Sequence, residues 1–131
     1  RDFMRGIALD ARAYVEARFR RMQLQAEGHQ WQERHPILIA PAFATPAFRL
    51  GERELEVNGS KLPMMQGGTA CSWANFMAVP AAVVPAGLAP GGLPVGVQVI
   101  GRPFRDPEVL AVARCLEQAL GGSPLPQLAR S

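Results

Sequence analysis

The sequence predicts an α/β protein in which helices flank a mixed β-sheet. Three observations support this fold class. Apolar residues recur every three or four positions over residues 2–27 and again over residues 106–120, which is the helical period. Three short apolar segments, residues 36–41, 81–85 and 95–100, lie between them and are typical of buried strands. The 131 residues also have the length of one ordinary domain.

The first predicted helix spans residues 2–27. Its apolar residues share one face: Met4, Ile7, Ala8, Ala11, Val15, Phe19 and Met22. Gly28 weakens helical geometry, and Pro36 disfavours it at His35. We therefore expect the helix to end near Glu27.

Residues 54–62 predict a small hairpin, because the polarity alternates before Asn58 and the pair Asn58-Gly59 is a tight-turn signal. A short helix is expected over residues 69–77, with Thr69 suited to cap its start.

The strands at 81–85 and 95–100 are joined by a loop rich in glycine and proline, and its length favours an antiparallel pair. The helix at 106–120 has the clearest boundaries. Asp106 is a good N-cap and precedes a proline at the first helical position, and Gly121 follows the last apolar residue.

Charge and cysteine content exclude several functions. The net charge is +3, from 14 basic and 11 acidic residues, and the one dense basic cluster is Arg18, Arg20 and Arg21. Such a cluster is more typical of a solvated helix face than of a nucleic-acid site, so we expect no nucleic-acid partner. Cys71 and Cys115 form neither a disulfide framework nor a zinc spacing. We expect a cytoplasmic protein without a metal or another cofactor.

The segment from Met77 to Gly101 is apolar, yet four prolines interrupt it. A membrane-spanning helix needs about 20 apolar residues in one run, so we expect no membrane span. The start of the sequence has no signal-peptide pattern.

No hydroxyl has a placed base, which a serine hydrolase would need. The candidates are Ser60, Ser72, Ser123, Ser131, Thr45 and Thr69. Lys61 is next to Ser60, but adjacent strand residues point to opposite faces of a sheet.

A thiol–imidazole pair of Cys71 with His29 or His35 is possible in principle, but no local pattern favours it. The two histidines are six residues apart, whereas metal-binding pairs on one helical face are about three or four apart. We assign no catalytic and no metal-binding residue.

An ordered series of residues carries a family resemblance. It consists of an Asn, a Pro-Ala pair, an apolar strand ending in Pro-x-Gly, a Gly-Leu-Pro loop, and a second apolar strand with a Gln and a final Gly. The matching positions are Asn75, Pro80-Ala81, Pro85-Ala86-Gly87, Gly92-Leu93-Pro94, Gly96, Gln98 and Gly101. This series resembles the C-terminal signature of the amidase family. Asp106-Pro107-Glu108 and the final helix resemble the element that closes such enzymes.

The resemblance implies the C-terminal part of an incomplete amidase-signature fold, which completes the sheet and walls the substrate cleft. It also implies that the Ser-Ser-Lys catalytic set of the family lies upstream, in a Gly/Ser-rich region that nothing here matches. We therefore carry over no catalytic residue. Gln66, Trp73 and Asn75 are the implied substrate-binding candidates, with local packing as the alternative for each.

One departure from the family bears on the substrate. Amidotransferase subunits that use glutamine tend to have an acidic residue one or two turns before the matching Asn. Here residues 66–71 contain no acid, which favours a general small-molecule amidase.

Two functions follow. The first is an amide hydrolase segment, and it predicts a large exposed apolar surface where the upstream part of the enzyme packs. The alternative is a non-catalytic module that pairs with a second copy or with another chain to cover that surface.

Overall fold

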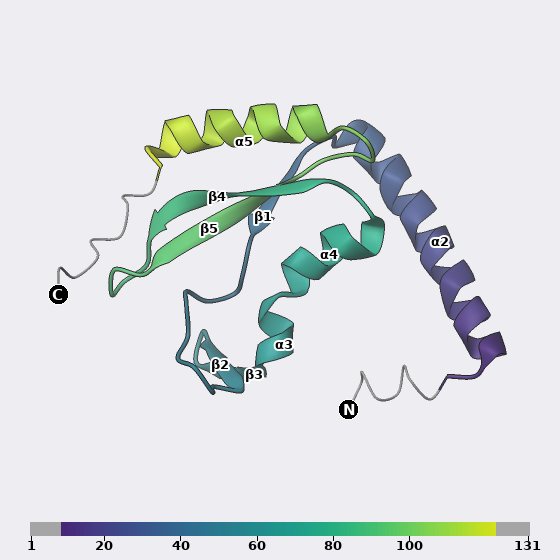
Figure 1. Ribbon diagram of the computed structural model, residues 1–131, viewed down its shortest axis with the longest axis horizontal. Coiled ribbons are helices and arrows are strands. Elements are labelled where there is room, and N and C mark those ends of the chain that lie inside the picture. Colours follow the sequence, from purple (N-terminus) through teal and green to yellow (C-terminus); the bar gives the residue numbers. More distant parts are fainter. Residues whose placement is uncertain (1–8, 123–131) are drawn as a thin grey trace.

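A computed structural model describes residues 9–122 (Figure 1). Along the chain, a long helix is followed by a strand, a hairpin, two short helices, two strands and a closing helix. Their bounds are α2 Ala11–Arg34, β1 Leu38–Pro41, β2 Glu54–Val57, β3 Ser60–Pro63, α3 Met64–Gly67, α4 Thr69–Met77, β4 Ala81–Leu88, β5 Pro94–Ile100 and α5 Asp106–Leu120. The α/β class predicted from the sequence is confirmed.

The main sheet has the strand order β1-β5-β4, with both pairs antiparallel. Leu38 and Ala81 both lie opposite Ile100, so β5 is the central strand. The antiparallel pairing of the last two strands agrees with the prediction from their short connection. Strand β4 continues beyond the expected Pro85, because a bulge between Pro85 and Gly87 lets the pairing resume.

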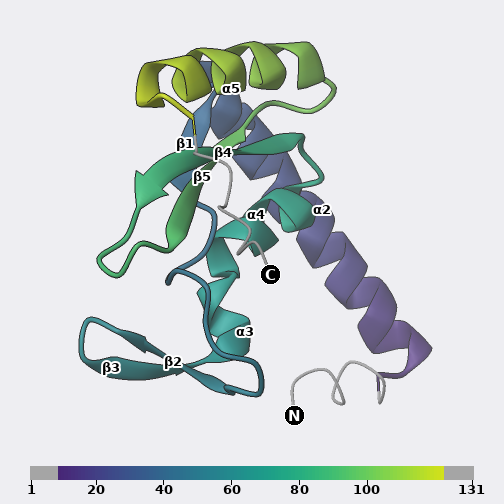
Figure 2. The same ribbon diagram turned by 60° about the vertical axis from the view of Figure 1, so that its left-hand side comes forward.

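Helix α5 covers one face of this sheet (Figures 1 and 2). The buried core between them consists of Val84, Val99, Val109 and Ala113. The helix has the predicted bounds, but its N-cap is Arg105 and not Asp106, which lies in the first turn. Gly121 ends the helix with φ 78°, a left-handed conformation that glycine adopts at little cost.

Helix α2 differs from its predicted bounds. It begins after Asp10, whose side chain accepts a hydrogen bond from the amide of Ala13 at 2.7 Å. Residues 2–8 of the predicted helix lie outside the described residues. The helix continues through Gly28 and ends at Arg34, so the prediction of an end near Glu27 was wrong. Pro36 is the effective stop signal, because it disfavours helical geometry at His35.

Gly28 has a packing reason inside the helix. A Cβ at this position would overlap Cε of Met77, at the end of α4. The glycine therefore leaves room for the end of the Met77 side chain.

The apolar face of α2 is exposed in the described residues. Val15, Phe19 and Met22 keep 48%, 62% and 57% of their surface exposed. The one buried residue in the helix is Gln32. Figures 1 and 2 show the N-terminal half of α2 extending away from the other elements, which explains the exposure.

The hairpin β2–β3 lies where the sequence predicts it, with Glu54 opposite Pro63. The helix expected at 69–77 is present as α4, and the short helix α3 precedes it. Gly68, and not Thr69, is the N-cap of α4. The hydroxyl of Thr69 instead donates to the carbonyl of Gln66.

Among the described helices, none combines the length and the apolar composition that crossing a membrane requires.

Candidate functional site

The loop that follows β1 contacts the two short helices, α3 and α4, and fixes their position. The amide of Ala44 donates to the carbonyl of Gly67 at 2.9 Å. Gly67 is buried, and a Cβ there would lie 2.6 Å from Cζ of Phe43 and would overlap Leu55. The thiol of Cys71 donates to the carbonyl of Ala42. The α3–α4 pair is thus fixed against this loop and the hairpin.

The same loop borders two adjoining hollows. The larger, of about 520 Å³, lies between residues 45–49, the hairpin and Leu93. The smaller, of about 240 Å³, lies between residues 42–48 and residues 94–96. The Gly-Leu-Pro motif therefore contributes to both walls. Within the described residues, the hydroxyl oxygen of Thr45 is buried without a hydrogen-bond partner, and Thr45 lines both hollows.

The three substrate-binding candidates lie on α3 and α4 but not in these two hollows. Gln66 is exposed, and its backbone carbonyl accepts the bond from Thr69. Trp73 is half-buried, and Asn75 is exposed. Trp73 and Asn75 share the helix α4, whereas Gln66 lies on the preceding helix α3.

The polar side chains of Arg21, Gln25 and His29 on α2 form a ladder that holds the end of α4. The sequence analysis did not predict this ladder. Arg21 donates to the backbone carbonyls of Asn75 (2.9 Å) and Phe76 (3.0 Å). Gln25 donates to the carbonyl of Phe76 at 2.7 Å, and His29 contacts the carbonyl of Met77 at 3.1 Å.

These carbonyls are the ones that a helix leaves unpaired at its C-terminus, where a cation is also favoured by the helix dipole. The guanidinium of Arg21 also lies 5.5 Å from the centre of the Phe76 ring. The spacing of Arg21, Gln25, His29 and Gln32 along one helix face is the signal that could have revealed the ladder.

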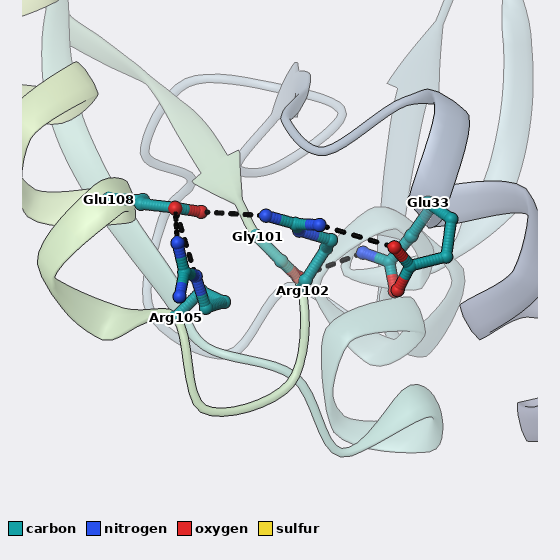
Figure 3. A network of polar contacts seen from close by, with 6 residues as sticks. Glu33, Gly101, Arg102, Arg105 and Glu108 are labelled. Carbon is teal, nitrogen blue, oxygen red and sulfur yellow. Dashed lines mark hydrogen bonds and ion pairs between the residues drawn. The ribbon is translucent and has the colours of Figure 1, made fainter.

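The ladder continues into a network around Gly101 (Figure 3). The buried amide of Gln32 donates to the carbonyl of Gly101 at 2.8 Å. Arg102 pairs with Glu33 on α2 at 3.3 Å and with Glu108 on α5 at 3.4 Å. The network thereby joins the first and last described helices at the end of the central strand.

Arg105 completes the network by donating to Glu108 through Nε at 2.9 Å and through a second guanidinium nitrogen. This hydrogen bond lowers the pKa of the Glu108 carboxyl and raises the pKa of Arg105. The carboxylates of Glu33 and Glu108 both pair with arginines. The role of this network is therefore structural.

Three of the possible nucleophiles within the described residues donate to backbone carbonyls, whereas the hydroxyl of Thr45 is buried without a partner. Ser72 donates to the carbonyl of Gly68, as Thr69 and Cys71 do to other carbonyls. Lys61 lies 3.6 Å from Glu54, across the hairpin from it. Ser123 and Ser131 lie outside the described residues.

Gln98 is a polar residue in an otherwise apolar strand, and it finds its partner in the neighbouring strand. It is buried in the central strand, and its amide donates to the carbonyl of Pro41 at 3.0 Å. It therefore ties β5 to the last residue of β1, directly before the loop that borders the hollows.

The strand order, the motif at the hollows and the closing helix define a segment of a larger α/β enzyme fold. Residues 2–110 match the amidase family. The chain belongs to this family.

The curated relatives that it matches include subunits of glutamyl-tRNA(Gln) amidotransferases. The chloroplastic/mitochondrial protein of Oryza sativa subsp. indica is 35% identical over 92% of this chain and 23% of its own length. The protein of Anaeromyxobacter sp. (strain K) is 40% identical over 69% of this chain and 18% of its own. The chain thus spans about a quarter, or less, of the length of these relatives.

Solved structures share the fold. A crystal structure of an amidase superposes with a TM-score of 0.82 at 29% identity, covering 90% of this chain and 27% of the amidase. A glutamyl-tRNA(Gln) amidotransferase subunit of Thermotoga maritima gives 0.70 at 30% identity, covering 95% and 28%. A 6-aminohexanoate cyclic dimer hydrolase complexed with substrate gives 0.76 at 25% identity, covering 89% and 26%. The Ser-Ser-Lys region of the family has no counterpart in these 131 residues.

Proposed function

We propose that residues 1–131 are the C-terminal segment of an amidase-type domain, and that this segment walls the substrate cleft of an amide (C–N) hydrolase. The observation that carries the proposal is the match to a solved amidase, which covers 90% of this chain and 27% of the amidase. The nucleophile and its bases then belong to the remainder of the fold.

The two hollows support the placement of the cleft wall. They join the Gly-Leu-Pro motif to the loop after β1, and both are lined by Thr45, whose hydroxyl oxygen is buried without a partner. A buried hydroxyl without a partner is costly, so a small movement of the loop after β1 that lets this hydroxyl bind a polar group would be favourable.

Gln66, Trp73 and Asn75 are the proposed substrate contacts on α3 and α4. An amide side chain can both donate to and accept from an amide substrate. The indole of Trp73 is half-buried and offers a flat apolar surface. The ladder from α2 would hold Asn75 in place through its backbone carbonyl.

The proposed substrate is a small amide and not glutamine, although several relatives are glutamyl-tRNA(Gln) amidotransferase subunits. Residues 66–71 contain no acid that could pair with the amino group of glutamine. The two free thiols suit the reducing conditions of the cytoplasm, which is the proposed location.

The test is a hydrolysis assay with aryl amides, alkyl amides and glutamine. It compares the isolated chain with a fusion in which this chain replaces the matched segment of the solved amidase. We expect no turnover from the isolated chain and turnover of small amides by the fusion. Asn75→Ala in the fusion should raise KM more than it lowers kcat, and Thr45→Val should do the same. An inactive fusion that is folded, or one that prefers glutamine, would contradict the proposal.

A further inference from the structure

The smaller of the two hollows is a pocket with aromatic side chains in its wall. Phe43 and Phe48 both line it, with their ring centres 5.8 Å apart and their planes tilted by 35°. Pro94 and Val95, at the start of β5, line it as well. Among the described residues around this pocket, Thr45 has the only polar side chain. The lining therefore favours a flat apolar group.

The two phenylalanine rings differ in how firmly they are held. A Cβ added to the buried Gly67 would lie 2.6 Å from Cζ of Phe43, so the Phe43 ring packs directly on the backbone of α3. Phe48, in contrast, keeps 44% of its surface exposed. A wall that is already in place binds a ligand without the entropic cost of ordering it. Phe43 thus preorganises the pocket, and Phe48 has the free surface for a ligand.

The volume of the pocket sets the size of the group that it accepts. The pocket encloses about 240 Å³, and an apolar protein cavity of about 150 Å³ is large enough to bind benzene. One six-membered ring fits, with room for the first atoms attached to it. Aromatic rings attract each other in tilted arrangements, and a ligand ring can extend the tilted pair of Phe43 and Phe48.

We propose that this pocket binds the ring of an aryl amide, so that the substrate class is a neutral or cationic aryl amide. The inference rests on the proposed function and narrows it. Thr45 lines both hollows, so an amide group attached to the ring would lie beside Thr45, where a small movement of the loop gives its hydroxyl a partner. Phe48 is the specificity-determining residue, because its exposed ring also lines both hollows.

The larger hollow determines which charge the rest of the substrate can carry. The described residues that line it include three acids and one base, which are Glu52, Glu54, Glu56 and Arg49. Lys61 lies 3.6 Å from Glu54 but lines a different hollow. A carboxylate beyond the amide group would therefore meet like charges, which discriminates against that ligand. A neutral or cationic substituent meets no such repulsion.

The test measures binding to the 131-residue chain by ligand titration, followed by two-dimensional NMR. The probes are acetanilide and benzamide, each compared with its cyclohexyl counterpart, N-cyclohexylacetamide or cyclohexanecarboxamide. In at least one pair, we expect the aryl probe to bind about threefold to tenfold more tightly, the range that aromatic contacts add to buried area. The responding pair identifies the side of the amide that carries the ring. The shifted signals should belong to residues 42–48 and 94–96, which line the pocket.

Substitution of Phe48 separates the aromatic contact from general burial. Phe48→Leu keeps an apolar side chain and should abolish the preference for the aryl probe, and Phe48→Met is a second variant in case the first does not fold. The matched control is Phe104→Leu, because Phe104 is 94% exposed and lines neither hollow. This control should retain the preference.

A second comparison tests the role of charge. Acetanilide with a para carboxylate should bind at least about threefold more weakly than acetanilide with a para aminomethyl group, because the carboxylate meets the acids of the larger hollow. The difference should shrink at high salt, which screens exposed charges. Equal binding of the two derivatives at low salt would remove charge from the proposed substrate class.

The pocket and the hydrolase function can fail separately. Equal binding of the aryl and cyclohexyl members in both pairs, or an unchanged preference in both Phe48 variants, would overturn the aryl pocket. Selective binding of an aryl probe to the chain, together with a folded but inactive fusion, would support the pocket and remove the hydrolase function. A fusion that hydrolyses small amides, with no aryl-selective binding, would keep the function and remove the pocket.

Discussion

Gly101 shows why a motif residue can be a glycine without adopting an unusual backbone. It is buried at the end of β5, and a Cβ there would overlap Cγ2 of Val109 in the core. Val109 is β-branched and fully packed, so it has little freedom to move aside. The same glycine accepts the hydrogen bond from Gln32.

Gly101→Ala should lower the free energy of unfolding by about 1–3 kcal/mol, the cost of overpacking a well-filled core. Urea denaturation of the isolated chain measures it. Gly68→Ala is the matched control, because a Cβ there meets Phe43 at an ordinary 3.5 Å and the backbone φ is −94°. Equal effects of the two substitutions would show that the contact with Val109 does not matter.

Glu108 should make stability depend on pH in a defined direction. Arg105 lowers the folded-state pKa of this carboxyl below its ordinary value of 4.5. The stabilisation is therefore complete above the ordinary pKa and is lost as the pH falls through the folded-state pKa. Because the pair is exposed, the effect should be small.

The measurement compares urea midpoints at about pH 7 and about pH 4 for the wild type and Glu108→Gln. The wild type should lose more stability on acidification than the variant does. An identical loss in both proteins would mean that Glu108 contributes nothing to the pH dependence.

The contact between α2 and α4 consists mainly of side-chain donors and backbone acceptors. Arg21→Met keeps the aliphatic stem of the side chain but removes two hydrogen bonds and the charge at the end of α4. We expect a loss of about 1–2 kcal/mol in the free energy of unfolding. Arg20→Met on the exposed side of the same helix should cost less than about 0.5 kcal/mol. Chemical denaturation measures both variants. Equal stability of the two would show that the hydrogen bonds of Arg21 do not stabilise the contact between α2 and α4.

Elements with local signals could be predicted from the sequence, whereas those that depend on distant partners could not. Asn58-Gly59 places the hairpin, and Gly121 places the end of α5. The end of α2 was predicted wrongly because Gly28 does not stop the helix. It leaves room for the side chain of Met77, which is about fifty residues away in the sequence. The sequence predicts caps at Thr69 and Asp106, but each lies one residue inside its helix.

The candidate site was predictable only in part for the same reason. The motif located the two strands and Gln98, but the sequence does not identify Pro41 at the end of β1 as the partner of Gln98. No sequence signal marks Thr45 as a buried hydroxyl, since its burial depends on how the loop after β1 meets Leu93 and Pro94. The roles of Gln66, Trp73 and Asn75 remain predictions.

At the level of the whole molecule, the described residues bury few large side chains and expose many. The buried apolar residues gather between α5 and the sheet, while α2 and the edge strands expose theirs. An amide hydrolase segment, the first function that the sequence suggests, predicts such a surface. This composition is expected of a segment that completes a larger fold, because a monomer that stood alone would seldom expose so many apolar groups.

The central claim is that the catalytic set lies elsewhere in the amidase fold. The most direct test is to treat the isolated 131-residue chain with a fluorophosphonate serine probe and to measure the mass of the intact protein. We expect no covalent labelling, because no hydroxyl within the described residues has a base in hydrogen-bond reach. Labelling of the folded chain at any serine, abolished by substitution of that serine with alanine, would show that this segment carries a nucleophile of its own and would refute that assignment.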